Sequence, residues 1–204
     1  MQQWCQKIGL IGLTTLIMTG CNHLTAVKRA TEADWRAGTP TETQAFDSSG
    51  RLAVVDEGKG SYANFNWQSL SQVQTIEVNT PLGNSVGVLC RDQYGVIAED
   101  NHGQITTAAS VEELSQNLLG FALPFDHLNQ WVQGYWITNQ PHKILPDGSL
   151  QQSGWIIHRD LLKENHYPRI VKLNNQRFEI KLVFDQFSPT AENTPQCELR
   201  QKQS

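Results

Sequence analysis

The sequence contains few residues whose type and spacing would support catalysis. It has no His-Glu-x-x-His zinc motif, and its six histidines are scattered without a recognisable triad. His158-Arg159-Asp160 has the letters of a kinase catalytic loop, but no glycine-rich loop or Asp-Phe-Gly accompanies it. Gly58-Lys59-Gly60 is too short to cradle a phosphate chain. The sequence therefore predicts a protein that is not an enzyme and that uses no cofactor or metal.

Cys21 is the residue whose chemistry the sequence specifies best. It follows a polar segment with one positive charge, Met1–Lys7, and an apolar segment, Ile8–Met18. The apolar segment is shorter than the roughly 20 residues of a spanning helix and fits a secretory leader. Thr19 and Gly20 then lead to the cysteine, as in a lipobox, where the sulfur takes a diacylglycerol and the new amino terminus a third acyl chain. We expect cleavage before Cys21 and a lipid anchor on it; the alternative is an ordinary signal peptide with a chance cysteine.

The other cysteines and the net charge limit the possible partners. Cys90 and Cys197 could form a bridge in an oxidising periplasm, but the sequence leaves their pairing open. The preferred interpretation of Cys90 is a small apolar residue in a strand, and Cys197 lies in a polar tail. With 16 basic and 20 acidic residues and no basic block, the chain is unsuited to nucleic acid. Attachment to a membrane would therefore depend on acyl chains and apolar contacts.

Most of the chain has the pattern of antiparallel strands. Residues 24–36 have helical composition with few apolar residues, so a tether with a loose helix at most is expected there. From Phe46 onward apolar residues alternate, and turn residues separate the alternating segments about every 8–12 residues, which indicates a curled sheet. The pairs expected to share a face are Leu52 and Val54, Phe65 and Trp67, Ile76 and Val78, Val86 and Val88, and Val96 and Ala98.

Two short helices interrupt this pattern. Ser110 and Glu113 form a capping box at the start of the first, which ends at Gly120. Pro124 opens the second, with Phe125, Leu128 and Trp131 or Val132 on one side. Strands resume from Trp155 and continue through the alternation of residues 178–184, and the residues beyond Ser188 are expected to be disordered.

These features resemble the LolB family, outer-membrane lipoproteins that accept other lipoproteins from a soluble periplasmic carrier, LolA. The resemblance extends through nearly the whole mature domain, and His158 and the long tail past Phe187 depart from it. The matching segments, in order, are Gly50-Arg51-Leu52-Ala53, Phe65-Asn66-Trp67, Pro81-Leu82-Gly83, Leu118-Leu119-Gly120, Leu123-Pro124, Trp131-Val132-Gln133-Gly134, Gly154-Trp155-Ile156-Ile157 and Pro168.

The resemblance implies a fold and a function. The fold would be a mainly β, half-open antiparallel β-barrel, with helices covering its concave face and an apolar cavity between them. LolA shares this fold, and the lipobox at Cys21 favours the acceptor over the carrier. The function would be to receive lipoproteins by burying their acyl chains and to insert them into the outer membrane without nucleotide. The implied partners are LolA, cargo lipoproteins and outer-membrane lipid.

Large apolar residues are the candidates for lining this cavity. Each could equally be plain core, since strands of either parity can face inward. Leu82 is a candidate membrane-insertion tip, because a leucine in a Pro-Leu-Gly-Asn turn is unusual, although it could also fold back onto the sheet. The candidate cavity residues are Phe65, Trp67, Ile76, Val78, Leu118, Leu123, Leu128 and Trp131.

The expected organisation has four parts. Residues 1–20 are the signal peptide, 21–43 a lipidated tether, 44–187 the acceptor domain and 188–204 a polar, disordered tail. Asn22 follows the cysteine in place of the Asp that resembles an inner-membrane retention signal, so we expect an anchor in the outer membrane. The domain is expected to face the periplasm and to be a monomer. The alternatives are a non-catalytic scaffold lipoprotein of a cell-envelope assembly or, less favoured, a lipid-acting envelope hydrolase.

Overall fold

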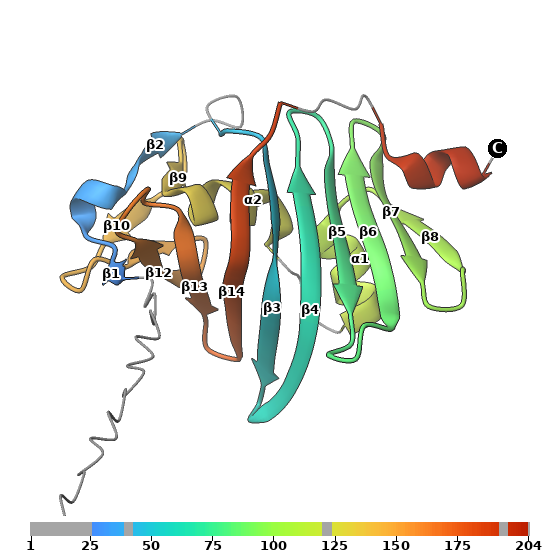
Figure 1. Cartoon of the computed structure of the whole chain (residues 1–204), viewed down its shortest axis with the longest axis horizontal. Coiled ribbons are helices and arrows are strands. Elements are labelled where there is room, and N and C mark those ends of the chain that lie inside the picture. The colour runs from blue at the N-terminus through green and yellow to red at the C-terminus, as the bar shows by residue number, and fades with distance from the viewer. Residues whose placement is uncertain (1–25, 39–42, 120–123, 192–195, 204) are drawn as a thin grey trace, which may run out of the picture.

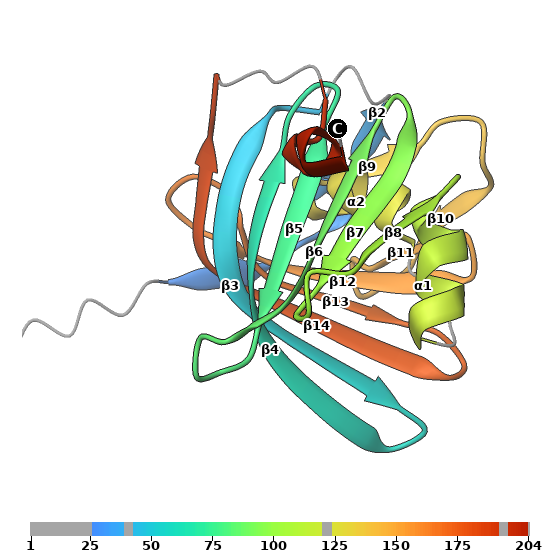
Figure 2. The same ribbon diagram turned by 90° about the vertical axis from the view of Figure 1, so that its right-hand side faces the viewer.

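The domain is a strongly curved antiparallel sheet that wraps around two helices (Figures 1 and 2). The computed structural model describes residues 26–38, 43–119, 124–191 and 196–203. In spatial order the main sheet runs through β10 (His142–Ile144), β11 (Leu150–Gln152), β12 (Trp155–Leu162), β13 (Pro168–Asn174), β14 (Phe178–Pro189), β3 (Phe46–Asp56), β4 (Lys59–Ser69), β5 (Gln74–Asn79), β6 (Ser85–Asp92), β7 (Gly95–Asp100) and β8 (Ile105–Ala108).

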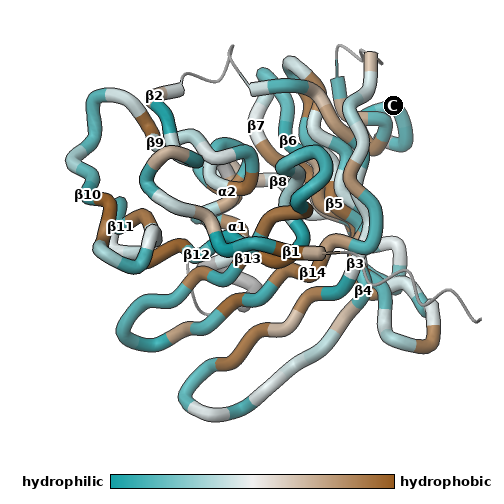
Figure 3. The backbone as a smooth tube through the Cα atoms, turned by 60° about the vertical axis from the view of Figure 1, so that its left-hand side comes forward, coloured by the Kyte–Doolittle hydropathy of each residue, from teal (hydrophilic) through white to brown (hydrophobic). Residues whose placement is uncertain are grey.

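The sheet is half-open, as the sequence predicted. Its path starts at β10 and ends at β8, and the first and last long strands of the domain, β3 and β14, pair in the middle. The alternation of apolar residues sends one set of side chains to the concave face and the other to the convex face, because strand residues alternate across a sheet. Hydrophobic and hydrophilic segments accordingly alternate along the strands of the sheet (Figure 3).

Two helices lie within the curve of the sheet. α1 (Val111–Leu119) starts as predicted, with the Glu113 amide donating to Ser110 Oγ at 3.1 Å, while the Glu113 carboxylate accepts from the Ala109 amide. α2 (Phe125–Gln133) follows Pro124 and ends at Gly134, whose φ of 88° is a left-handed cap. Phe125, Leu128, Trp131 and Val132 are all buried, which confirms the predicted inner side of this helix.

The prediction of a loose tether over residues 21–43 is wrong for its second half. β1 (Val27–Arg29) pairs with β12, and β2 (Arg36–Gly38) pairs in parallel with β9 (Tyr135–Ile137). A short 3-10 helix, η1 (Glu32–Asp34), lies between β1 and β2 in the chain. Trp35 is buried, and its indole N–H donates to the Gly148 carbonyl at 2.8 Å. These contacts reach residues 99 to 135 positions away, so the local pattern of residues 24–36 gave no sign of them.

The prediction of a disordered tail is also wrong where the structure describes it. Cys197 forms a disulfide with Cys90, and η2 (Glu198–Gln203) lies against the convex face at β7. Arg200 pairs with the buried Asp92 carboxylate at 2.7 Å. Cys90, Cys197 and Leu199 are buried together in a small apolar cluster, so the preferred interpretation of Cys90 as an unpaired apolar residue is corrected too.

Candidate functional site

The concave face of the sheet carries a continuous set of apolar side chains. Residues that face each other across neighbouring strands share a face. Phe65 pairs with Val78, and Trp67 pairs with Ile76. On the other side of β4, Leu52 of β3 lies opposite Leu182 of β14. All four predicted strand positions, Phe65, Trp67, Ile76 and Val78, therefore lie on this concave face.

One part of this face is closed by α2. Phe65 and Trp67 are buried in the same apolar cluster as Leu128 and Trp131 of the helix. The rings of Trp67 and Phe125 have centroids 5.9 Å apart. Trp131 donates its indole N–H to Gln152 Oε1 at 3.1 Å. The helix side chains thus occupy the space that the sequence analysis assigned to an apolar cavity, and this part of the face is a packed interface.

Trp67 carries an unsatisfied polar atom within that interface. Its Nε1 is buried and has no hydrogen-bond partner among the described residues. A buried N–H without an acceptor typically costs about 1–3 kcal/mol. The packing between α2 and the sheet is therefore tight but not optimal at its centre.

The remainder of the face is only partly covered. Ile76 and Val78 are half-buried, as are Leu52, Val54 and Leu89, and all of these except Val78 pack against the edge of the central cluster. An apolar strip from β3 to β6 is thus continuous with the surface beneath α2. A long apolar chain could contact this strip before it displaced any helix side chain.

The two remaining candidate lining residues lie at the limits of the description. Leu118 belongs to α1, but its side chain is outside the described residues, and Leu123 is wholly outside them. Their assignment to the cavity stays a prediction. Sequence analysis did not name Phe46, Phe125 and Phe184 as lining residues, although all three are buried in the same cluster. Their alternating or helical spacing was the signal that could have identified them.

Leu82 projects from the turn between β5 and β6 and is 91% exposed. The turn is held by Gly83 N to Thr80 O, by Thr80 N to Asn84 O, both at 2.8 Å, and by Asn84 N to Thr80 Oγ1. The possibility that Leu82 folds back onto the sheet is therefore excluded. A hydrogen-bonded turn that presents a bare leucine is suited to contact with an apolar phase.

This turn also contains the letters of a hydrolase motif. Gly83-Asn84-Ser85-Val86-Gly87 reads Gly-x-Ser-x-Gly, the pattern of a nucleophile elbow. An elbow needs a turn from a strand into a helix, whereas these residues connect two strands of one sheet. The motif is therefore a coincidence of sequence and gives no support to a hydrolase.

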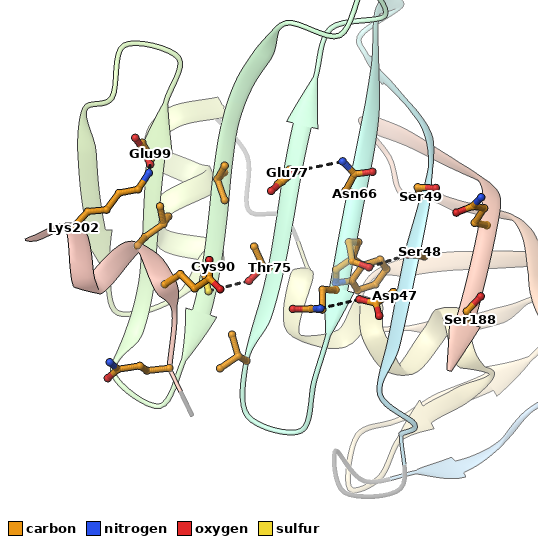
Figure 4. Close-up of a pocket in the computed structure, with 18 residues that line it drawn as sticks. Asp47, Ser48, Ser49, Asn66, Thr75, Glu77, Cys90, Glu99, Ser188 and Lys202 are labelled. Atoms are coloured by element: carbon orange, nitrogen blue, oxygen red, sulfur yellow. Dashed lines mark hydrogen bonds and ion pairs between the residues drawn. The ribbon is translucent and has the colours of Figure 1, made fainter. Parts of the chain in front are cut away.

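A hollow also lies on the opposite, convex face (Figure 4). It has a volume of about 600 Å³, and polar side chains such as Asp47, Asn66, Gln68 and Glu77 line it. Such a surface is unsuitable for acyl chains. Among the described residues, no cluster of His, Cys, Asp or Glu could hold a metal ion. No helix in this part of the chain is both long and apolar enough to cross a membrane.

Comparison with known proteins identifies a family for this architecture. The sequence model of the outer membrane lipoprotein LolB matches residues 44–187. The outer-membrane lipoprotein LolB of Neisseria meningitidis is 42% identical over 89% of this chain and 91% of its own, and that of Chromobacterium violaceum is 33% identical over 87% and 96%. A solved domain of a putative outer membrane lipoprotein-sorting protein from Vibrio parahaemolyticus covers 76% of this chain and 89% of its own at 8% identity, with a TM-score of 0.43. That structural likeness is too distant to support an inference about function.

Proposed function

The chain belongs to the LolB family of outer-membrane lipoproteins, and from this membership we propose that it accepts lipoproteins from a soluble carrier of the LolA kind and inserts them into the outer membrane. The acyl chains of the cargo would lie on the concave face, between the sheet and α2. The observation that carries this proposal is the continuity of the apolar surface from the half-exposed strip of β3–β6 to the buried cluster beneath the helix.

The energies involved allow a reversible exchange between helix and cargo. One long acyl chain gains about 10 kcal/mol on burial, since each methylene contributes roughly 0.8 kcal/mol. A buried large apolar side chain contributes about 1.5–3 kcal/mol. The four buried apolar residues of α2, Phe125, Leu128, Trp131 and Val132, therefore represent a comparable total. Cargo can replace the helix on the sheet without a large net change in free energy.

The length of α2 supports its role as the displaceable element. A helix of nine residues is too short to be stable in water by itself, so it depends on an apolar surface beneath it. An acyl chain would supply such a surface as well as the sheet does. The unsatisfied N–H of Trp67 weakens the closed arrangement at the position where the chain would enter.

No nucleotide is required in this scheme. A ligand moves between proteins only by differential affinity, so transfer would run downhill from carrier to acceptor to bilayer. Leu82 would act in the last step, where its exposed side chain enters the membrane near the site of release. The anchor on Cys21 would keep the domain at the outer membrane.

Transfer from a loaded carrier tests the proposal directly. A soluble chain that begins at Ala26, and so keeps β1 and Trp35, should take a lipoprotein from its carrier at equimolar protein without ATP. Trp67→Ala and Trp131→Ala should reduce this uptake more than Lys172→Ala, because the Lys172 side chain lies on the face of β13 opposite the cluster. Because truncating a buried tryptophan costs about 3–5 kcal/mol, unfolding must be measured for each variant at the same temperature.

A requirement for ATP, or a carrier that stays loaded, would contradict the proposal. The alternative, a non-catalytic scaffold of an envelope assembly, needs no ligand on the concave face. It predicts that the purified protein binds neither a lipoprotein nor a fluorescent apolar dye, whereas an acceptor binds both.

A further inference from the structure

A second hollow of about 360 Å³ lies at the end of the domain where the chain enters the fold. Its walls come from η1 and β2, from the last turn of α2, and from β12 and the loop that leads into β13. Two arginines, Arg36 and Arg159, line it, together with polar residues such as Gln133 and His166. This hollow lies beside the central apolar cluster, to which Trp35 in its wall belongs.

Arg159 is a buried cation that has no anionic partner among the described residues. Its side chain is on the concave face of β12, and the residue is only 3% exposed. Nε donates to the Val132 carbonyl at 3.2 Å and Nη1 to the Asp34 carbonyl at 3.0 Å, while the indole ring of Trp35 covers one face of the guanidinium. No carboxylate of the described residues forms an ion pair with it. Of the five N–H donors of an arginine, three have no acceptor among the described residues.

Arg36 brings a second cation to the same hollow. Its guanidinium stacks on the ring of Tyr135 and donates to the Tyr135 hydroxyl at 2.7 Å. No carboxylate of the described part of the chain pairs with it either. Burial lowers the pKa of Arg159 to about 10, and repulsion by the like charge of Arg36 adds to this effect. The Arg159 guanidinium remains charged at neutral pH.

The acid in the wall of the hollow is already engaged. Asp34 accepts from Lys28 Nζ, Thr31 N and Thr31 Oγ1, each at 2.9 Å. Its charge favours the charged form of Arg159 from a distance, but its carboxylate oxygens already accept hydrogen bonds from Lys28 and Thr31. Burying a charge without a partner is costly, and carbonyl oxygens compensate for only part of that cost. The fold keeps this charge next to an open space.

We propose that this hollow binds a phosphate-class oxyanion between Arg159 and Arg36. Guanidinium groups bind such oxyanions through paired, charge-assisted hydrogen bonds, and Arg159 has free donors to form them. A water molecule takes about 30 Å³ of liquid, so the hollow has room for a phosphate with a small attached group. Two sources share this chemistry, free phosphate and the headgroup of a phospholipid. The headgroup is within reach, because only a few residues separate β1 from Cys21.

Titration of the full-length protein with two probes tests the proposal and separates the sources. The first probe is inorganic phosphate, at an ionic strength held constant with chloride. The second is dihexanoylphosphatidylglycerol below its micelle concentration, with dihexanoylglycerol as a phosphate-free blank. Binding is followed by the ³¹P line width and by the unfolding temperature. We expect both phosphate probes to bind and the blank to leave the unfolding temperature unchanged. A lower Kd for the phospholipid would identify a headgroup as the ligand, and equal Kd values would identify phosphate alone.

Charge variants assign the binding to the two arginines. Arg36→Gln removes an exposed charge and should raise the Kd at least tenfold. Arg159→Lys keeps the buried charge but loses the paired donors, and should weaken binding similarly. Arg29→Gln is the matched control, since Arg29 is an exposed arginine at the same end of the domain that does not line the hollow. The proposal is overturned if neither phosphate probe binds, or if Arg36→Gln binds as tightly as Arg29→Gln and the wild type.

Discussion

At the scale of single residues, Gly134 shows how closely the elements approach each other. It ends α2 with a positive φ, and its amide and carbonyl both take part in backbone hydrogen bonds. A Cβ at this position would lie 2.4 Å from Arg159 Nη1 and 2.7 Å from the Asp34 carbonyl oxygen. The absence of a side chain here is what allows Arg159 to reach both α2 and η1.

Gly134→Ala should therefore destabilise the domain more than its backbone angle alone explains. The left-handed conformation costs a non-glycine residue about 1–2 kcal/mol, and the clash with Arg159 adds to this. Gly154→Ala is the matched control, because Gly154 has a φ of 80° and nothing within 4 Å of its added Cβ. Denaturant unfolding of both variants measures the difference. Equal losses of stability would show that Arg159 moves aside without cost.

At the scale of elements, the N-terminal segment depends on the ionised Asp34. Burial works to raise the pKa of Asp34, but the hydrogen bonds from Lys28 and Thr31 and the charge of Lys28 lower it to about 2. A carboxyl whose pKa is lowered in the folded state adds stability above its unfolded pKa, near 4, and this stability is lost as the pH falls toward 2.

Asp34→Asn should remove this contribution, which amounts to about 2 kcal/mol because each pKa unit corresponds to about 1.4 kcal/mol. The variant should be less stable than the wild type at neutral pH, and the difference should shrink between pH 4 and pH 2. Urea unfolding at several pH values tests this. Glu32→Gln, an exposed acid in the same 3-10 helix, should have little effect. A difference that does not change with pH would contradict the role of the charge.

The C-terminal segment is held by the Cys90–Cys197 bridge across 107 residues of sequence. A disulfide typically stabilises a protein by about 2–4 kcal/mol, mainly by restricting the unfolded chain. Cys90→Ala with Cys197→Ala should lower the free energy of unfolding by that amount. A reducing agent should destabilise the wild type and leave the double variant unchanged. If the reducing agent has no effect on the wild type, the bridge does not contribute.

These two terminal elements also mark the limit of the sequence analysis. The strands around Phe65 and Trp67 and the helix starting after Pro124 were predictable, because each shows its own period over several residues. Trp35, by contrast, is buried against Gly148, and Cys197 against Cys90 and Ile97. Such contacts depend on partners far along the chain, which local composition does not reveal. The same holds for the hollow at Arg159, whose walls come from five separate segments.

At the scale of the whole molecule, we predict that Leu82 is needed for the delivery of cargo but not for its receipt. The side chain is exposed and outside the apolar cluster, so Leu82→Glu should leave folding and cargo uptake intact. Insertion into liposomes should fail, since placing a charge in the hydrocarbon region costs at least about 2–4 kcal/mol. Co-purification of cargo and its appearance in liposomes measure the two steps. Gln93→Glu, in the exposed turn between β6 and β7, controls for the added charge. Normal delivery by Leu82→Glu would make Leu82 an ordinary turn residue.

The pairing of β3 with β14 limits how early in its synthesis this protein can complete its sheet. The two strands come from opposite ends of the domain, and their ladder is as long as that between β3 and β4. Because the chain is made from its amino terminus, β3 can pair with β14 only after almost all of the domain has been synthesised. During that wait the aromatic residues of β4 are exposed, and contacts between distant residues form slowly. A nascent chain halted at Asn175 should therefore show no cooperative unfolding and should bind general chaperones. The synthesis of the last strand should limit the rate at which the domain folds.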